Sequence, residues 1–189
     1  VVRVVSVGPL AVKKSFPDLM KAFAALGPDR RYRLTVYGDG PMREALEAER
    51  HALGLDEAVD FAGEHDSTVI VEAMQQADVF AMTPFVTADG DRDGVPNVVV
   101  EALAAGLPVV STDVGGVSEA VMHGHNGLLS KPRDVPGITA TLERLLRDPE
   151  LRHAMGARAR ATVEAGFDVD RAAEQLVGAP PGYQQKTLV

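Results

Sequence analysis

Residues 89–106 read DGDRDGVPNVVVEALAAG. An acidic loop leads to Pro96, and the mostly apolar run that follows ends at Gly106. Proline suits the first turn of a helix, where its missing N–H leaves no hydrogen bond unmade, and glycine suits the residue after the helix end. The pattern therefore predicts a buried helix over residues 96–105.

Two acids in this stretch need a chemical reason. Glu101 lies in the second turn of the apolar helix, and Asp93 lies eight positions before it. The N-terminus of a helix carries free N–H groups and positive dipole character, which suit a phosphate. A carboxylate one turn deeper can accept hydrogen bonds from hydroxyl groups. The element thus combines phosphate donors with two hydroxyl acceptors, as a sugar nucleotide requires.

Outward from this stretch, strand-like and helix-like segments alternate along the chain. Helices of 10 to 15 residues between short apolar strands are typical of βαβ units. The sequence therefore predicts an α/β fold, a Rossmann-like three-layer α/β/α arrangement with a parallel sheet. The expected strands cover residues 3–7, 32–37, 58–62, 79–82, 107–111 and 127–130, and the expected helices cover 16–26, 42–53, 68–76, 96–105, 115–121 and the region from 135 onward, with breaks near Pro149 and Gly166.

Glycine-bearing turns follow several of these strands. They contain Gly8, Gly38 with Gly40, Gly94, and Gly115 with Gly116. Ligands of doubly wound sheets bind outside the carboxyl ends of the strands, so the turns are expected to converge on one site.

Lys13 and Lys14 follow the first strand. They are either solvated loop residues or, because they lie at that strand end, charges that neutralise a diphosphate.

Composition narrows the function classes. The chain has 189 residues, of which 46% are hydrophobic and 24% charged, with a net charge of −8. An acidic chain does not hold nucleic acid by a general basic surface. The absence of cysteine rules out disulfides and thiolate metal sites. No apolar run reaches the roughly 20 residues of a membrane span. The chain lacks an initiator Met and starts in a strand-like run, so we expect a piece of a longer, cytoplasmic polypeptide.

Several competing motifs are incomplete. Gly38-Asp39-Gly40 resembles the start of a dinucleotide fingerprint, but the third glycine is replaced by Arg43. A tight strand-to-helix turn explains these two glycines better. No serine lies in a nucleophile elbow.

Metal-binding patterns are equally incomplete. Residues 89–94 match the start of a calcium loop, but its twelfth position is Val100, because Glu101 comes one step late. His123 and His125 have no third ligand in view, and ordinary loop histidines explain them better. The sequence predicts no metal site.

Longer blocks of the sequence resemble a known family. VGPLAVKKSFPDLMKAF, YGDGPMREALE, DGVPNVVVEALAAGLPVVSTDVGGVSEAV and NGLL occur in the order found in the C-terminal domain of retaining, GT-B-fold glycosyltransferases of family 4. The resemblance implies a donor-binding domain over residues 1–178, the C-terminal half of a GT-B fold. Residues 179–189 are then a mobile tail, and the acceptor-binding N-terminal domain lies outside this chain.

The resemblance also implies roles for individual residues. Glu101 binds the ribose hydroxyls, Asp93 contacts the transferred sugar, and Lys14 binds the diphosphate together with the glycine turn after the first strand. No cofactor or metal is expected besides the nucleotide-sugar donor. The donor-binding positions are Gly8, Gly94, Val95, Pro96, Asn97 and Glu101, with Gly63, Glu64 and His65 facing the nucleobase.

Three positions depart from the family pattern. Ser15 replaces a customary glycine, Asp93 replaces a glutamate, and Pro9 stands where an arginine is usual. Pro9 matters most, because arginine supplies forked, charge-assisted hydrogen bonds to a diphosphate and proline supplies none.

The function that the resemblance implies is retaining transfer of a sugar from a nucleoside diphosphate to an acceptor hydroxyl. The acceptor, a sugar or a lipid-linked sugar, would bind through the N-terminal domain, and the full-length protein could associate peripherally with a membrane. Two alternatives stay open: a GT-B-fold sugar-nucleotide epimerase, and a degenerate domain that binds nucleotide sugars without catalysis. Base, sugar and acceptor are left open.

Overall fold

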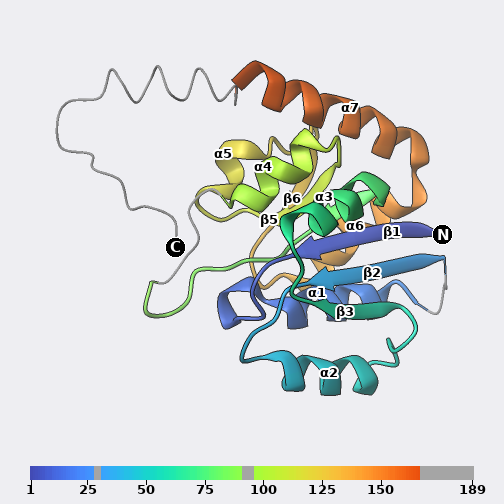
Figure 1. The fold of residues 1–189 in the computed structure, drawn as a ribbon, viewed down its shortest axis with the longest axis vertical. Coiled ribbons are helices and arrows are strands. Elements are labelled where there is room, and N and C mark those ends of the chain that lie inside the picture. Colours follow the sequence, from blue (N-terminus) through green and yellow to red (C-terminus); the bar gives the residue numbers. More distant parts are fainter. Residues whose placement is uncertain (28–30, 91–95, 167–189) are drawn as a thin grey trace.

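The computed structural model describes residues 1–27, 31–90 and 96–166. Strands and helices alternate through these ranges as predicted, and Figure 1 follows them in order. The elements are β1 (Val2–Val7), η1 (Val12–Lys14), α1 (Phe16–Ala25), β2 (Tyr32–Tyr37), α2 (Arg43–Ala52), β3 (Val59–Gly63), α3 (Ser67–Gln76), β4 (Val79–Ala81), α4 (Asn97–Ala104), β5 (Val109–Thr112), α5 (Val117–Ala120), β6 (Gly127–Ser130), α6 (Val135–Arg147) and α7 (Pro149–Gly166).

The strands form one parallel sheet in the order β3-β2-β1-β4-β5-β6. Chain order therefore reverses between β1 and β4, which lie side by side in the middle of the sheet. Such a reversal opens a crevice, because the connections after the two neighbouring strands leave toward opposite faces. The prediction of a parallel sheet is confirmed.

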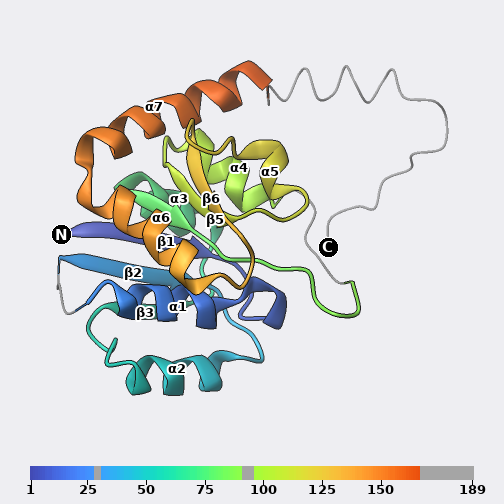
Figure 2. The same ribbon diagram turned by 180° about the vertical axis from the view of Figure 1, so that it is seen from behind.

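Helices cover both faces of the sheet (Figures 1 and 2). On one face α1 packs against α2 and α6, around a core that contains Leu19, Leu46 and Leu142. On the other face α3, α4 and α5 enclose a second core with Phe80 and Leu103. Helix α7 packs against both α4 and α6. This confirms the three-layer arrangement that the sequence predicts.

Small differences in element bounds have local causes. Helix α4 begins at Asn97, because Pro96 has an extended ψ of 120° and serves as the N-cap. Strand β5 begins at Val109 instead of residue 107, after a proline that has no N–H to give to a ladder. The short helix η1 was not predicted, since three residues show no apolar period. The predicted break at Pro149 separates α6 from α7.

None of the helices in the described ranges has the length and apolar character that crossing a membrane requires.

Candidate functional site

The connections after β1 and β4 meet at the crevice where the strand order reverses. The N–H of Phe85 donates to the carbonyl of Lys13 across 3.0 Å. The hydroxyl of Thr83 donates to the carbonyl of Ser15 across 2.9 Å. Two bonds therefore fix the turn after β1 against the chain that leaves β4 and leads toward the acidic loop.

Lys14 lies in the turn after β1, beside this point of the sheet. It is the last residue of η1, and only 8% of its surface is exposed. Its side chain runs over Gly8, so that a methyl group at Gly8 would lie 3.5 Å from Cε and 3.8 Å from Nζ of the lysine. The structure thus brings together two predicted site residues, and it places a cation beside the main chain at the carboxyl end of β1.

Pro9 follows Gly8 and is exposed. Its carbonyl accepts a hydrogen bond of 2.8 Å from the N–H of Ala11, which closes the turn. Proline has neither an N–H nor a polar side chain, so this position supplies no donor to a ligand. Position 9 therefore lacks the forked donors that an arginine would supply.

Helix α4 presents one face to the core and another to solvent. Val99, Ala102 and Leu103 are buried, whereas Asn97 and Glu101 are exposed. Asn97 and Glu101 are four residues apart and so lie on the same side of the helix. Glu101 does not turn into the core. The prediction of a buried helix holds for one face only, and the other face carries the predicted carboxylate.

The first residues of the predicted phosphate loop, Asp93, Gly94 and Val95, lie outside the described residues. Pro96 is described and buried, as the cap of α4. No side chain caps this helix end through its N-cap residue, Pro96, because proline has no side-chain acceptor.

The predicted nucleobase loop lies at the end of β3. Gly63 is its last strand residue and has a φ of +85°, which favours glycine. Glu64 and His65 are exposed, and the His65 ring meets the ring of Tyr37 edge-on at 5.6 Å. These residues share the carboxyl edge of the sheet with Lys14.

The glycines of the β2–α2 turn have a structural role. A methyl group at Gly38 would overlap the carbonyl oxygen of Gly8, and one at Gly40 would lie 2.8 Å from the carbonyl oxygen of Leu10. Two turns at adjacent strand ends approach this closely only without side chains. The interpretation of these glycines as a tight turn is supported, and it needs no dinucleotide.

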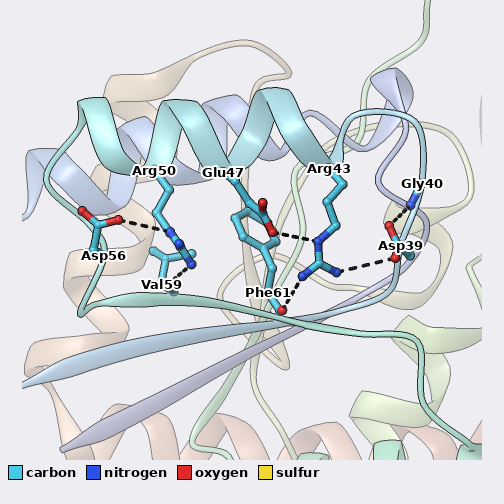
Figure 3. Close-up of polar contacts among 8 residues, drawn as sticks. All are labelled: Asp39, Gly40, Arg43, Glu47, Arg50, Asp56, Val59 and Phe61. Carbon is cyan, nitrogen blue, oxygen red and sulfur yellow. Dashed lines mark hydrogen bonds and ion pairs between the residues drawn. The ribbon is translucent and has the colours of Figure 1, made fainter.

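Arg43, which replaces the third fingerprint glycine, ties α2 to the sheet (Figure 3). Its Nε donates to Glu47 at 2.8 Å, Nη2 donates to the Phe61 carbonyl at 3.0 Å, and Nη1 lies 3.6 Å from a carboxylate oxygen of Asp39. The hydrogen bond that the guanidinium donates to the Glu47 carboxylate raises the pKa of Arg43. Arg43 also lies beside Gly63, so this cluster packs α2 against the end of β3.

The remaining candidates do not gather into a site. The Nδ1 atom of His123 accepts a bond from the N–H of Leu129 at 3.0 Å, and the carbonyl of His125 accepts one from Arg158 at 2.6 Å. In the ranges that the structure describes, no three acidic, histidine or cysteine side chains are grouped as metal ligands. Of the calcium-like pattern, Asp91 and Asp93 lie outside those ranges.

The Gly115-Gly116 turn opens a helix as predicted, but α5 has only four residues. The hydroxyl of Ser118 donates to the carbonyl of Gly115 at 3.0 Å, so it closes the turn rather than facing a catalytic base. Glu119 is exposed.

Two residues of the crevice were not foreseen. Thr83 fixes the turn after β1, and Arg133 reaches the same turn from the β6–α6 connection. Arg133 lies 118 positions from its partner Ser15, so no local sequence pattern connects them. For Thr83, its place directly after the strand predicted over residues 79–82 is the only signal that the sequence offered.

Sequence comparison places most of the chain in one family. The family described as "Glycosyl transferases group 1" matches residues 2–162. The N-acetyl-alpha-D-glucosaminyl L-malate synthase of Bacillus anthracis is 30% identical over 162 residues, which are 86% of this chain and 40% of that enzyme.

Solved structures show the same fold. The HepE protein of Anabaena, crystallised with UDP, has a TM-score of 0.81 and 25% identity, covering 94% of this chain and 49% of HepE. The C-terminal domain of the group 1 glycosyltransferase LpcC from Francisella tularensis has a TM-score of 0.78 at 20% identity, a likeness of fold that covers 89% of this chain and 87% of that domain. The chain therefore spans less than half of the B. anthracis enzyme and of HepE, but nearly all of the LpcC domain.

Proposed function

Because the chain belongs to the group 1 glycosyltransferase family, we propose that it is the donor-binding half of a glycosyltransferase. The donor would be a nucleoside-diphosphate sugar, and the acceptor a hydroxyl group of a sugar or of a lipid-linked sugar. Transfer would retain the anomeric configuration.

One observation carries the proposal furthest. Lys14 lies against Gly8 at the point where the strand order reverses, the place where doubly wound sheets bind their ligands. A diphosphate bound at this strand end would come within reach of the Lys14 ammonium group, which forms charge-assisted hydrogen bonds to phosphate oxygens. HepE, which has the same fold, was crystallised with UDP.

The proposed chemistry is electrostatic. As the glycosidic bond to the donor breaks, negative charge grows on the leaving diphosphate. Lys14 and the backbone N–H groups at the start of α4 would stabilise this charge as fixed groups that need no reorganisation. This assignment needs no metal ion.

The other predicted residues would hold the rest of the donor. The exposed carboxylate of Glu101 would accept hydrogen bonds from the ribose hydroxyls, and Asp93 would contact the transferred sugar. The loop of Gly63, Glu64 and His65 would face the base. Gly63 ends β3, and Glu64 and His65 follow it directly. Glu101 lies in α4, the helix that follows β4 along the chain.

The acceptor site belongs to the proposed N-terminal domain. The chain covers 40% of the B. anthracis synthase and 49% of HepE, and the remaining length of such proteins can supply that domain. We propose that the full-length enzyme acts in the cytoplasm and can associate peripherally with a membrane that carries its acceptor. Alone, the present chain should bind the donor and catalyse poorly.

A second candidate is a domain that binds nucleotide sugars without catalysis. Pro9 favours it, because this exposed position lacks the forked cation that the family pattern places there. Donor hydrolysis by the full-length protein separates the two: an active enzyme releases nucleoside diphosphate, and a degenerate domain does not.

Calorimetric titration of the chain with UDP, ADP and GDP tests the proposal. We expect one of them to bind with a dissociation constant below one millimolar, and the matching monophosphate to bind more weakly because it lacks the second phosphate that Lys14 neutralises. No heat from any of the three diphosphates at millimolar concentration would overturn the donor-site assignment.

A further inference from the structure

Two residues adopt a backbone conformation that their types disfavour. Among the described residues, Ser15 with φ +47° and Arg133 with φ +64° are the non-glycine residues in the left-handed region. Each such residue costs of the order of 1 kcal/mol, and it persists only where surrounding contacts hold it. Ser15 and Arg133 are 118 positions apart in the chain, yet they contact each other.

The contact is a closed set of three side chains. The Ser15 hydroxyl donates to the carboxylate of Asp18 at 2.6 Å. Nη1 of Arg133 donates to the Ser15 hydroxyl oxygen at 2.9 Å and lies 3.2 Å from the same carboxylate. The Asp18 side chain is only 6% exposed, whereas that of Arg133 is 57% exposed. Arg133 thus neutralises a buried carboxylate from the rim of the crevice.

Arg133 also contacts the segment that follows β4. Its guanidinium lies over the ring of Phe85, 4.9 Å from the ring centroid. Phe85 in turn donates its N–H to Lys13. One side chain therefore contacts both the turn that carries Lys14 and the segment that leads from β4 toward the acidic loop.

We propose that Arg133 is a positioning residue for the donor site, and this inference rests on the proposed function. Through Ser15 and Asp18 it fixes the turn that aims Lys14, and through Phe85 it fixes the distance from that turn to the β4 exit. Arg133 acts on the diphosphate through Lys14 and does not itself replace the missing arginine at position 9.

Without the guanidinium, the Asp18 carboxylate keeps its hydrogen bond from Ser15 but loses the positive charge of Arg133. A buried carboxylate without a cation favours any rearrangement that hydrates it. The turn can supply that rearrangement by leaving the left-handed conformation at Ser15, the residue directly after Lys14. The expected result is a lysine that spends less time over Gly8.

A double-mutant cycle tests whether Arg133 acts through Lys14. The variants are Arg133→Ala, Lys14→Met and the double variant. Each is titrated with the nucleoside diphosphate that the wild-type chain binds best. Alanine at position 133 is still a non-glycine residue in the left-handed region, so Arg133→Ala removes the side-chain contacts without relieving the backbone strain. Arg133→Ala should weaken binding about tenfold in the wild-type background and by less than about twofold in the Lys14→Met background, as expected for coupled residues. Arg160→Ala removes the same charge from an exposed i,i+4 pair on α7 and should leave affinity unchanged.

The outcomes separate the two proposals. Additive losses would mean that Arg133 acts independently of Lys14, and an unchanged affinity of Arg133→Ala would remove Arg133 from the site; either result overturns the inference and leaves the proposed function standing. A wild-type chain that binds no nucleoside diphosphate would overturn the proposed function instead.

Hydrogen exchange provides a readout that needs no ligand. In Arg133→Ala, amides in peptides covering residues 10–18 and 82–86 should exchange faster, while the rest of the described chain keeps its wild-type rates. Arg160→Ala should change neither peptide. Unchanged exchange in both segments, or an equal increase throughout the chain, would contradict a local positioning role.

Discussion

Two neighbouring turns at the carboxyl edge of the sheet use glycine and charge in opposite ways. In the turn after β2, Gly38 and Gly40 allow a backbone approach, and Arg43 is fully occupied by groups of its own domain. In the turn after β1, Gly8 leaves room for the side chain of Lys14, which would contact the proposed donor.

The difference shows that a glycine-rich turn at a strand end does not by itself mark a ligand site. The β2–α2 turn matches a ligand-binding fingerprint more closely in sequence, yet its glycines are required by contact with Gly8 and Leu10. What distinguishes the β1–α1 turn is its place beside the reversal of strand order. The comparison predicts that substitutions in the β2–α2 turn cost stability and that substitutions in the β1–α1 turn cost ligand binding.

The largest effect should follow from Gly38→Ala. The added methyl group would overlap the Gly8 carbonyl at a φ of +140°, so we expect a loss of more than about 3 kcal/mol in the free energy of unfolding. Urea denaturation measures this loss. Gly54→Ala is the matched control: it has a φ of +66° but open space around it, and should cost only about 1 kcal/mol. Equal losses in the two variants would break the comparison.

Lys14→Met should have the next largest effect, on binding. Methionine keeps an apolar stem over Gly8 and removes the charge, so nucleoside-diphosphate affinity should fall by about 2–3 kcal/mol, with a much smaller change in unfolding free energy than Gly38→Ala causes. Calorimetry and urea denaturation on the same protein check both quantities. Lys21→Met, which removes an exposed lysine paired with Glu49, should bind like the wild type. Full affinity in Lys14→Met would place the diphosphate elsewhere.

Glu101→Ala should have the smallest effect of the three. The carboxylate is exposed on α4, so its removal should leave stability nearly unchanged and weaken nucleotide binding by about 1–2 kcal/mol through lost hydrogen bonds to the ribose. The loss should shrink when a 2′,3′-dideoxynucleotide is the ligand, because the partners of Glu101 are then absent. Glu72→Ala on α3 is a control for surface charge. A loss of the same size with both ligands would assign Glu101 another role.

Sequence patterns predicted most of the fold, because alternating strands and helices of these lengths have few arrangements open to them. The bounds of β2 and β6 agree with the predicted ranges. The patterns also singled out Glu101, because an acid in the second turn of an apolar helix needs a chemical reason. Helix η1 was missed because its three residues, Val12 to Lys14, carry no periodic signal.

The side-chain network of the crevice could not be predicted. Serine and arginine rarely adopt left-handed conformations, and the contact between Ser15 and Arg133 joins residues 118 positions apart. The resemblance identified Ser15 only as a replaced glycine. The structure adds the reason, because position 15 has a conformation that glycine adopts without cost.

A crystal structure of the chain with its tightest-binding nucleoside diphosphate tests the central claim most directly. We predict the β-phosphate within hydrogen-bonding distance of Lys14 Nζ, over Gly8, with the ribose hydroxyls on the Glu101 carboxylate. A nucleotide bound away from the β1–β4 crevice, with Lys14 still lying against Gly8, would contradict it.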